Sequence, residues 1–314
     1  MPLVGSVYPP EVWAQESLMV LRDTLVMARL VHRDFENVVA QQGDTVNTRK
    51  PAKGTARTWA GQAAFTDASE QIHVENLHAN NLAIVLDTIQ YTAFLVQDKD
   101  AVTSMKNLRE EFIIPYVDPI AQAVDDDIMT EMTAAASAGV GGAALTAYAH
   151  DTVGLGADMN EDDIIKAREQ LFTNQCPMDR SLSLVLSAQH EADCLALALF
   201  HQADQSGSTE ALTNANLGRK FGFGIYATQN VPTALDTDAT PQSLAFHRNV
   251  CALVTRPLGA MDEYGAKFGV QAMDGIGIRV ASDYSILHKG VIVSFDVLYG
   301  VQLLDSHLGV IVNP

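Results

Sequence analysis

The C-terminal third of the chain contains the pattern that most restricts the fold. Between residues 291 and 303 every odd-numbered side chain is apolar, whereas Ser294, Asp296 and Gln302 lie at positions between them. A period of two places the apolar residues on one face of a strand, so we predict a half-buried β-strand here. Residues 276–284 are its expected partner. Part of the core must therefore be a β-sheet.

Two other segments have the spacing of helices. Within residues 11–40 apolar positions recur every three or four residues, which stacks their side chains on one helix face. Residues 101–137 form a longer helical stretch, with apolar side chains at similar intervals. Pro115 and Pro119 interrupt it, and we expect each proline to kink or split the helix.

A second α/β region is expected from about residue 160. Asn160 is a suitable N-cap, and the three acids after it lie where the helix dipole favours negative charge, so we predict a helix that ends near residue 174. Ser187 is the expected cap of another helix, which runs to about residue 203. The strands predicted in this region cover residues 181–186, 220–229 and 243–256.

Residues 44–71 are too polar to belong to a core. Glycines and a proline separate their extended segments, so we predict a long hairpin-like excursion that leads into the extended residues 72–97. The charge also changes sign along the chain. Residues 41–60 have four bases and one acid, a net charge of +3, whereas residues 98–170 have 15 acids and 5 bases, a net charge of −10.

Composition limits the classes of protein that remain. With 314 residues, 47% of them hydrophobic, the chain can bury a large core without a disulfide or a metal. A formal net charge of −18 argues against a protein that binds nucleic-acid phosphates over a basic surface. The widely spaced Cys176, Cys194 and Cys251 favour a reducing compartment. Since residues 1–20 lack a signal-peptide pattern and no apolar run is long enough for a bilayer, we expect a soluble protein made in a cytoplasm.

Three short motifs are candidates for chemistry, and for each we favour a structural explanation. The run from His190 to Cys194 resembles a zinc-protease helix with Cys in place of the second His, but no third ligand has a recognisable spacing. Residues 222–227 fit a loose dinucleotide-binding fingerprint without the helix that should follow, so we expect a strand whose glycines let another backbone come close. The run of acids at 125–127 contains cation ligands, but consecutive helical residues point in different directions. We therefore expect no catalytic, cofactor or metal site.

The basic segment at residues 49–57 is the strongest candidate for an interaction. Its cations and the neighbouring indole are Arg49, Lys50, Lys53, Arg57 and Trp59. They could contact nucleic acid weakly, or dock on an acidic surface of a neighbouring copy such as residues 98–170 provide. A solvated hairpin without a partner is the third alternative, and the residues alone leave all three open.

Several phrases follow one another in a distinctive order. They are GDTVNTRKP at 43–51, EEFIIP at 110–115, DPIAQAVD at 118–125, residues 160–171 with 183–187 and the helix after them, residues 218–232 ending in Asn-Val-Pro, and residues 274–283 with the terminal strand. This order resembles the major capsid (coat) proteins of tailed double-stranded-DNA bacteriophages, which have the Hong Kong-phage-type fold. The resemblance is closest to the short-tailed Salmonella-phage coat protein group. It spans essentially the whole chain, by order and pattern.

The resemblance implies an α+β phage major-capsid fold with four parts. They are an N-terminal arm helix (1–43), an extended loop (44–80), a peripheral domain with a long spine helix and a β-sheet (81–155 and 244–314), and an axial α/β domain (156–243). The implied function is structural, without catalysis or cofactor. Copies of the chain would assemble into pentamers and hexamers, and these into an icosahedral shell that encloses double-stranded DNA without reading its sequence.

The resemblance also implies partners. Other copies come first, and a separate scaffolding protein and a portal are expected because no extension resembles the fused scaffold of some members. The protein would be found in the virion, after assembly in the bacterial cytoplasm, with no membrane contact. Longer members of the group carry an inserted β domain, for which this chain has no room.

The arm and the loop are the expected contacts between subunits. The loop residues Arg49, Lys50, Lys53, Arg57 and Trp59 would meet a neighbour's carboxylates, for which Asp125, Asp126, Asp127 and Glu131 are the candidates. Some relatives crosslink a loop lysine to a neighbour's asparagine; Lys50 and Lys53 are the lysines available, but no other residue supports this. An encapsulin-type compartment for cargo enzyme is the alternative function. A metal or nucleotide enzyme would have to use His190, Cys194 or residues 222–227.

Overall fold

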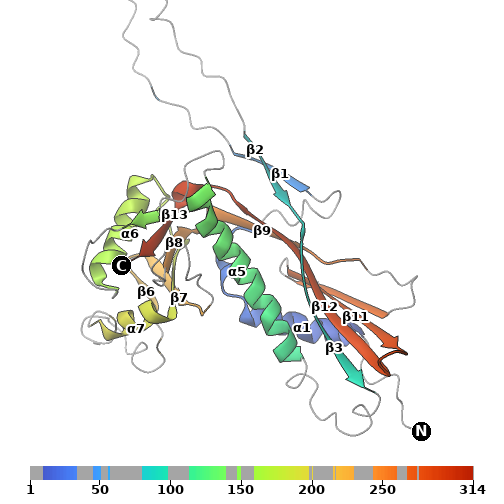
Figure 1. Cartoon of the computed structure of the whole chain (residues 1–314). Helices are drawn as coiled ribbons and strands as arrows, with labels where there is room; N and C mark the ends of the chain where they lie inside the picture. Colours follow the sequence, from blue (N-terminus) through green and yellow to red (C-terminus); the bar gives the residue numbers. More distant parts are fainter. Residues whose placement is uncertain are drawn as a thin grey trace, which may run out of the picture.

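The computed structural model of the chain describes residues 10–33, 45–50, 56, 80–97, 113–138, 147–149, 159–197, 200, 215, 217–229, 243–259, 267–273 and 276–313. Within them, two sheets lie at the two ends of the molecule, joined by the long helix α5 and by two strand connections (Figure 1). The helices are α1 (Pro10–Thr24), α2 (Met27–Leu30), α5 (Ile114–Ala138), α6 (Glu161–Thr173) and α7 (Ala188–Ala196). The fold is therefore α+β, as expected.

The first sheet contains the strand with the period of two. Its strands are β3 (Thr88–Gln97), β9 (Cys251–Arg256), β10 (Lys267–Met273), β11 (Ile276–Ser285) and β12 (Gly290–Leu303). They form the antiparallel order β10-β11-β12-β3, and β9 pairs with the last residues of β12. The predicted strand and its partner at 276–284 are thus confirmed. Asp296, on the face predicted to be polar, is buried and paired with Arg279, whose Nη2 lies 2.7 Å from Asp296 Oδ2.

The helices α1 and α5 pack against this sheet. Their apolar residues share one core with β3, β11 and β12. At its centre, the ring centroid of Phe94 lies 5.8 Å from that of Trp13 and 4.7 Å from that of Tyr116, and Trp13 also contacts Phe295. Aromatic pairs at such distances add to the stability that burial itself provides. The N-terminal helix is therefore part of the body of the subunit.

The second sheet forms the other end of the molecule. Its strands are β4 (Ala147–Ala149), β5 (Leu182–Leu186), β6 (Arg219–Lys220), β7 (Phe223–Ala227), β8 (Ser243–His247) and β13 (Gly309–Asn313), in the order β4-β13-β8-β5-β7-β6. All five residues of β5 are buried, as is typical of a strand with helices on its faces. The helix α6 packs on β13 and β8, and α7 follows β5 directly.

Two connections carry the chain between the sheets. β8 leads through the 3₁₀ turn η4 (Arg248–Val250) into β9, and β12 leads through η6 (Ser306–Leu308) into β13. The amide of Leu304 donates to the carbonyl of Val250 at 2.8 Å, so the two crossings lie side by side. After α2, His32 pairs with β9 as well, because its amide donates to the carbonyl of Cys251 at 3.0 Å.

The strands β1 (Thr45–Lys50) and β2 (Asn80–Val85) form a separate antiparallel pair. Val46 and Ile84 are buried against Ala252 and Val254 of β9, so the base of this pair is attached to the body. A Cβ at Gly300 of β12 would overlap with the carbonyl oxygen of Val85, so this close contact requires glycine. In Figure 1 the two strands lead away from α5 and the sheets.

Two helix predictions were wrong in detail. The predicted helix at 11–40 divides, because α1 ends at Thr24 and α2 is a short second turn. The spine helix continues through Pro119. Pro115 lies in its first turn, where an amide has no partner within the helix anyway, and Pro119 removes only the bond to the carbonyl of Pro115. The prolines therefore cost little so near the start of the helix.

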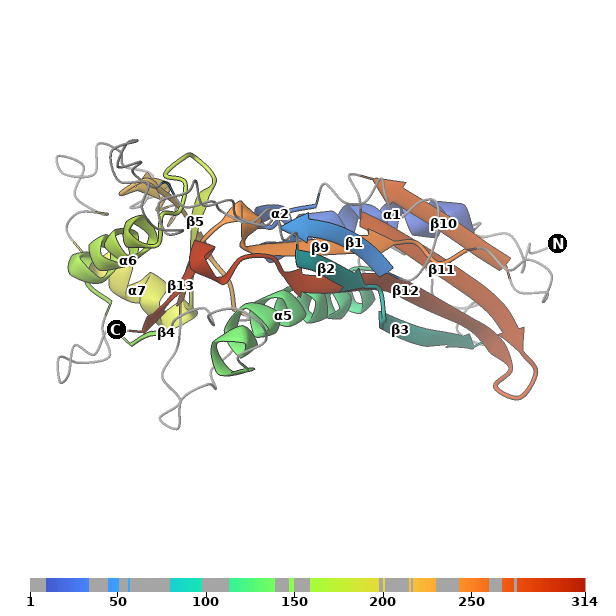
Figure 2. The same ribbon diagram turned by 90° about the horizontal axis from the view of Figure 1, so that it is seen from above.

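Figure 2 shows the molecule elongated from above, with α6 and α7 at one end and the far ends of β11 and β12 at the other. Of the helices in the described part of the chain, none is long and apolar enough to cross a membrane.

Candidate assembly surfaces

The predicted basic loop begins and ends in the β1–β2 pair. Thr45 lies opposite Val85 at the attached base, and Arg49 and Lys50 lie opposite Asn81 and Asn80 at the other end. The first two predicted contact residues are therefore on a strand that leads away from the body. Lys53, Arg57 and Trp59 lie outside the described residues, and contact of this segment with a neighbour stays a prediction.

Asp125, one of the candidate acceptors, has a partner inside its own subunit. Its side chain is 3% exposed, and its carboxylate accepts hydrogen bonds from the amides of Val26 (2.9 Å), Met27 (3.1 Å) and Ala28 (3.3 Å). These are amides at the start of α2, which have no acceptor within that helix. Burial raises the pKa of Asp125 to about 6, against the lowering effect of the three hydrogen bonds. Asp125 thus holds the N-terminal segment on the spine helix, and a contact with another subunit is not what its position favours.

The other three acids of α5 have different surroundings. Asp127 is half-buried and accepts a hydrogen bond from the hydroxyl of Tyr299. Burial, followed by the hydrogen bond to Asp127, raises the pKa of Tyr299. Asp126 is exposed, and Glu131 is half-buried. Asp126 and Glu131 therefore remain the better candidates for a neighbour's cations.

The three consecutive carboxylates do not converge on a cation. Asp125 points to the start of α2, Asp127 to Tyr299, and Asp126 to the surface. In the described ranges no group of three His, Cys, Asp or Glu side chains could hold a metal ion. We derive no cofactor site from these residues.

His190 and Cys194 are packing residues of α7. Nδ1 of His190 lies 2.6 Å from Oγ of Ser243, and the ring is buried. Cys194 Sγ lies 3.9 Å from the sulfur of Met159. Burial lowers the pKa of His190 and raises that of Cys194 to about 12, so neither group is prepared to act as a ligand or a nucleophile at neutral pH. Their role is to join α7 to β8 and to the start of α6.

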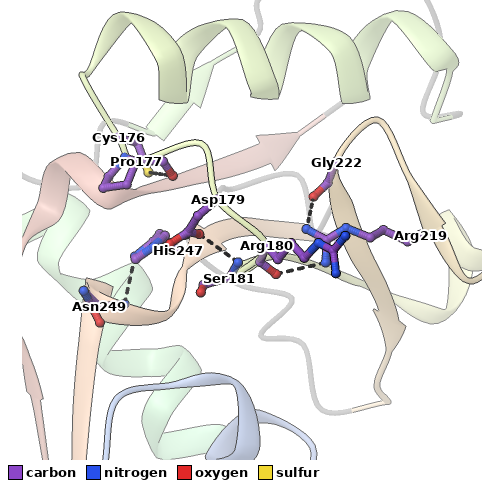
Figure 3. A network of polar contacts seen from close by, with 9 residues as sticks. All are labelled: Cys176, Pro177, Asp179, Arg180, Ser181, Arg219, Gly222, His247 and Asn249. Carbon is purple, nitrogen blue, oxygen red and sulfur yellow. Dashed lines mark hydrogen bonds and ion pairs between the residues drawn. The ribbon is translucent and has the colours of Figure 1, made fainter.

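The glycine-containing run at 222–227 forms a hairpin turn and strand β7, so it does not open a helix. Phe221 and Gly222 have φ of 50° and 90°. The guanidinium of Arg168 on α6 donates to the carbonyl of Phe221 at 2.6 Å, and a Cβ at Gly222 would overlap with it. Arg219 donates to the carbonyls of Gly222 (2.6 Å) and Arg180 (2.9 Å), as Figure 3 shows. Side chains, and not the backbone that we expected, come close to this glycine.

Sequence reasoning missed a second part of the network in Figure 3. Nε2 of His247 lies 3.2 Å from Oδ1 of Asp179, and its Nδ1 accepts a hydrogen bond from the amide of Asn249 at 3.2 Å. The amide of Ser181 donates to Asp179 Oδ1 at 2.8 Å, and this bond, with a smaller contribution from His247, lowers the pKa of Asp179. The network joins the turn before β5 to the end of β8. The pair is 68 residues apart in sequence, so no local spacing could predict it.

A cleft of about 430 Å³ lies where the two ends of the subunit meet. It is lined by the α1–α2 junction, by Gln122 and Asp125 of α5, by Glu191 of α7 and by the residues that follow β7. No described side chain in it has the pairing of acid, base and nucleophile that catalysis requires. The cleft therefore separates two packed units and lies beside the hydrogen bonds of Asp125.

The chain can be compared with known proteins through its fold. No protein-family model matches it, and neither does any curated protein. A solved structure from Mycobacterium phage Che8 is similar with a TM-score of 0.63 and 18% identity, over 91% of this chain and 90% of that chain. The capsid of Ralstonia phage GP4 is similar with a TM-score of 0.55 and 14% identity, over 90% and 87%.

A crystal structure of a virus-like particle from Pyrococcus furiosus is also similar, with a TM-score of 0.51 and 9% identity over 96% of this chain and 98% of that chain. At such identities the likeness establishes the fold. The chain has the Hong Kong-phage-type capsid fold that its segment order resembles.

Proposed function

We propose that this chain, which has the Hong Kong-phage-type capsid fold, is the shell subunit of a tailed bacteriophage. Copies of it assemble into pentamers and hexamers, and these into an icosahedral capsid that encloses double-stranded DNA. The observation that carries the proposal is the shared fold, which extends over nearly the whole of this chain and of the phage structures. The protein then belongs in the virion, after assembly in the bacterial cytoplasm.

The described geometry supports a structural role. The β1–β2 pair is attached to β9 at its base and leads away from the body, which suits a segment that contacts a neighbour. The four-part division into arm, extended loop, peripheral domain and axial domain follows the two sheets, the hairpin and α1. We keep its boundaries at 43, 80, 155 and 243 as part of the proposal.

Two finer points also belong to the proposal. A separate scaffolding protein and a portal complete the assembly. Membership of the short-tailed Salmonella-phage coat protein group rests on the order of the sequence phrases alone, and the chain is shorter than the members with an inserted β domain.

An encapsulin-type compartment is the second candidate function. The observation that favours it is the likeness to the Pyrococcus furiosus particle, which covers nearly all of both chains. The TM-scores of the phage structures above are higher, so we place the capsid first.

Negative-stain electron microscopy of the purified chain tests the proposed function. We expect uniform closed shells, tubes or rings. A compact monomer at every concentration contradicts the proposal. The content of particles purified from infected cells then separates the two candidates, since nuclease-resistant double-stranded DNA supports a capsid and a copurifying enzyme supports a compartment.

A further inference from the structure

The turn between β11 and β12 has an unusual composition. Ile286 is 72% exposed and Leu287 is 92% exposed, although tight turns normally carry glycine, asparagine or other polar residues at these places. Tyr284 and Val291, which face each other across the hairpin, are exposed as well. Single exposed apolar residues are ordinary, but four together at one tip are typical of a contact surface.

The hairpin tip holds these side chains in place. Oγ of Ser285 lies 2.9 Å from Nδ1 of His288, which closes the turn. Lys289 has a positive φ of 49°, and a Cβ at Gly290 would overlap with the carbonyl oxygen of Val96 on β3. The base of the tip is therefore packed closely against the neighbouring strand. A surface held in one conformation loses little entropy when it binds.

The charges beside the apolar residues identify the partner. Asp283 on the β11 side and Lys289 on the β12 side are both exposed and of opposite sign. A second tip turned to face the first can place Lys289 against Asp283 while the apolar residues meet between them. The surface is thus complementary to another copy of itself, in charge and in apolarity.

The tip is distant from the loop that we expect to contact neighbours. It lies at the first residue of β12, whereas β9, which carries the β1–β2 pair, joins the last residues of the same strand. Fourteen residues of strand span about 45 Å. A subunit with contact surfaces at both ends of one strand can enter two different interfaces, and a closed shell requires contacts between rings as well as within them.

We propose that the β11–β12 tip, centred on Ile286 and Leu287, is a contact between copies of this chain, formed with the same tip of subunits in adjacent rings. This inference rests on the proposed function, because it names an interface of the shell. It adds a surface that the basic loop and the spine acids do not include.

Substitution of Leu287 tests the inference in the full chain. We expect Leu287→Asp to fold with an unchanged melting temperature, since the side chain is 92% exposed in the subunit, and to give pentamers and hexamers in place of closed shells by sedimentation and microscopy. Leu287→Met, the matched control, keeps the apolar surface and should close shells like the unmodified chain. Shells from Leu287→Asp in normal yield overturn the inference, as does a fall in its subunit melting temperature.

Crosslinking gives a second test. In Leu287→Cys the new thiol is exposed, whereas Cys176, Cys194 and Cys251 are buried, so a short bismaleimide should join pairs of chains through residue 287 in assembled particles and not in free subunits. Absence of these dimers in closed shells overturns the inference while the proposed function stands. If the unmodified chain forms no assembly at all, the proposed function fails and the tip contact fails with it.

Discussion

Asp125 shows how one carboxylate connects two segments of the subunit. Three amides near the start of α2 share its oxygens, and two of them, those of Met27 and Ala28, belong to the first turn of that helix. The negative charge therefore meets the positive end of a short row of peptide dipoles. The side chain has lost its water, and this loss outweighs the hydrogen bonds and raises its pKa to about 6.

This raised pKa predicts a pH dependence of the free energy of unfolding. The folded protein binds a proton at Asp125 more tightly than the unfolded chain, whose aspartates have a pKa near 3.8. Stability from this group therefore rises as the pH falls from about 7 to about 4, by about 3 kcal/mol at most. The amide side chain introduced by Asp125→Asn cannot titrate, so the stability of the original protein relative to this variant should increase over the same range.

Denaturant unfolding of the subunit at a series of pH values measures this difference. Comparison with Asp125→Asn removes the contribution of the other carboxylates, which both proteins share. Asp126 and Glu191 are the other acids close to Asp125, at the surface of α5 and across the cleft. A difference that stays constant between pH 7 and pH 4, or that falls toward low pH, would show that Asp125 is not buried as described.

The role of Asp125 could not be predicted from the sequence. Its run of three acids suggested a solvated or intersubunit face, because the residues whose amides it binds are 97 to 99 positions away. The same limit applies to His190, for which the sequence predicted a packing role but not its partner Ser243. Local spacing indicates which face a residue occupies, whereas a contact between distant segments depends on how the elements pack.

At the scale of elements, the base of the extended hairpin is the part whose stability can be measured. Ile84 is fully buried between β2 and β9, while its neighbour Val85 is 44% exposed. Replacement of a buried isoleucine by alanine leaves a cavity, so Ile84→Ala should lower the free energy of unfolding by about 2 to 5 kcal/mol. Val85→Ala is the matched control, and its effect should be about 0.5 kcal/mol or less.

Thermal and denaturant unfolding of the two variants give these values, and hydrogen exchange of the β1 amides gives the local effect. We expect the amide of Val46, which lies opposite Ile84, to lose more protection in Ile84→Ala than in Val85→Ala. Equal effects of the two substitutions would mean that the hairpin is not attached to β9 through this side chain.

The predicted elements succeeded where a pattern was long and local. The strand at 291–303 has thirteen residues of alternation, and the cap and acids at 160–163 begin the helix α6, whose Asp163 carboxylate accepts the amide of Asn160 at 3.0 Å. The predicted helix at 11–40 failed because its apolar spacing continues past Thr24, while the amides after that residue bind Asp125 on another element. Tertiary contacts decided the end of that helix.

At the scale of the whole molecule, the net charge of −18 is unevenly distributed. The surroundings of the basic loop carry +3, and residues 98–170 carry −10. Within the acidic segment, Asp125 and Asp127 have partners in their own subunit. The acids left to meet a neighbour's loop are therefore fewer than the sum suggests, which makes the contact more specific.

The last prediction follows from this distribution. Reversal of Arg49, Lys50, Lys53 and Arg57 to Glu should leave a folded, soluble subunit and reduce the yield of closed shells at least tenfold, because each reversed charge would meet a carboxylate of the neighbour and like charges repel. Adding Asp126→Lys and Glu131→Lys to the reversed chain should restore part of the yield, since opposite charges meet again. The same two changes in Asp125 and Asp127 would break bonds inside the subunit, so they form the control that should not restore it. Yields are compared by sedimentation at low and high salt, and the loss should be smaller at high salt, where exposed charges are screened. Normal shells from the reversed chain would contradict the assignment of the loop as a contact between subunits.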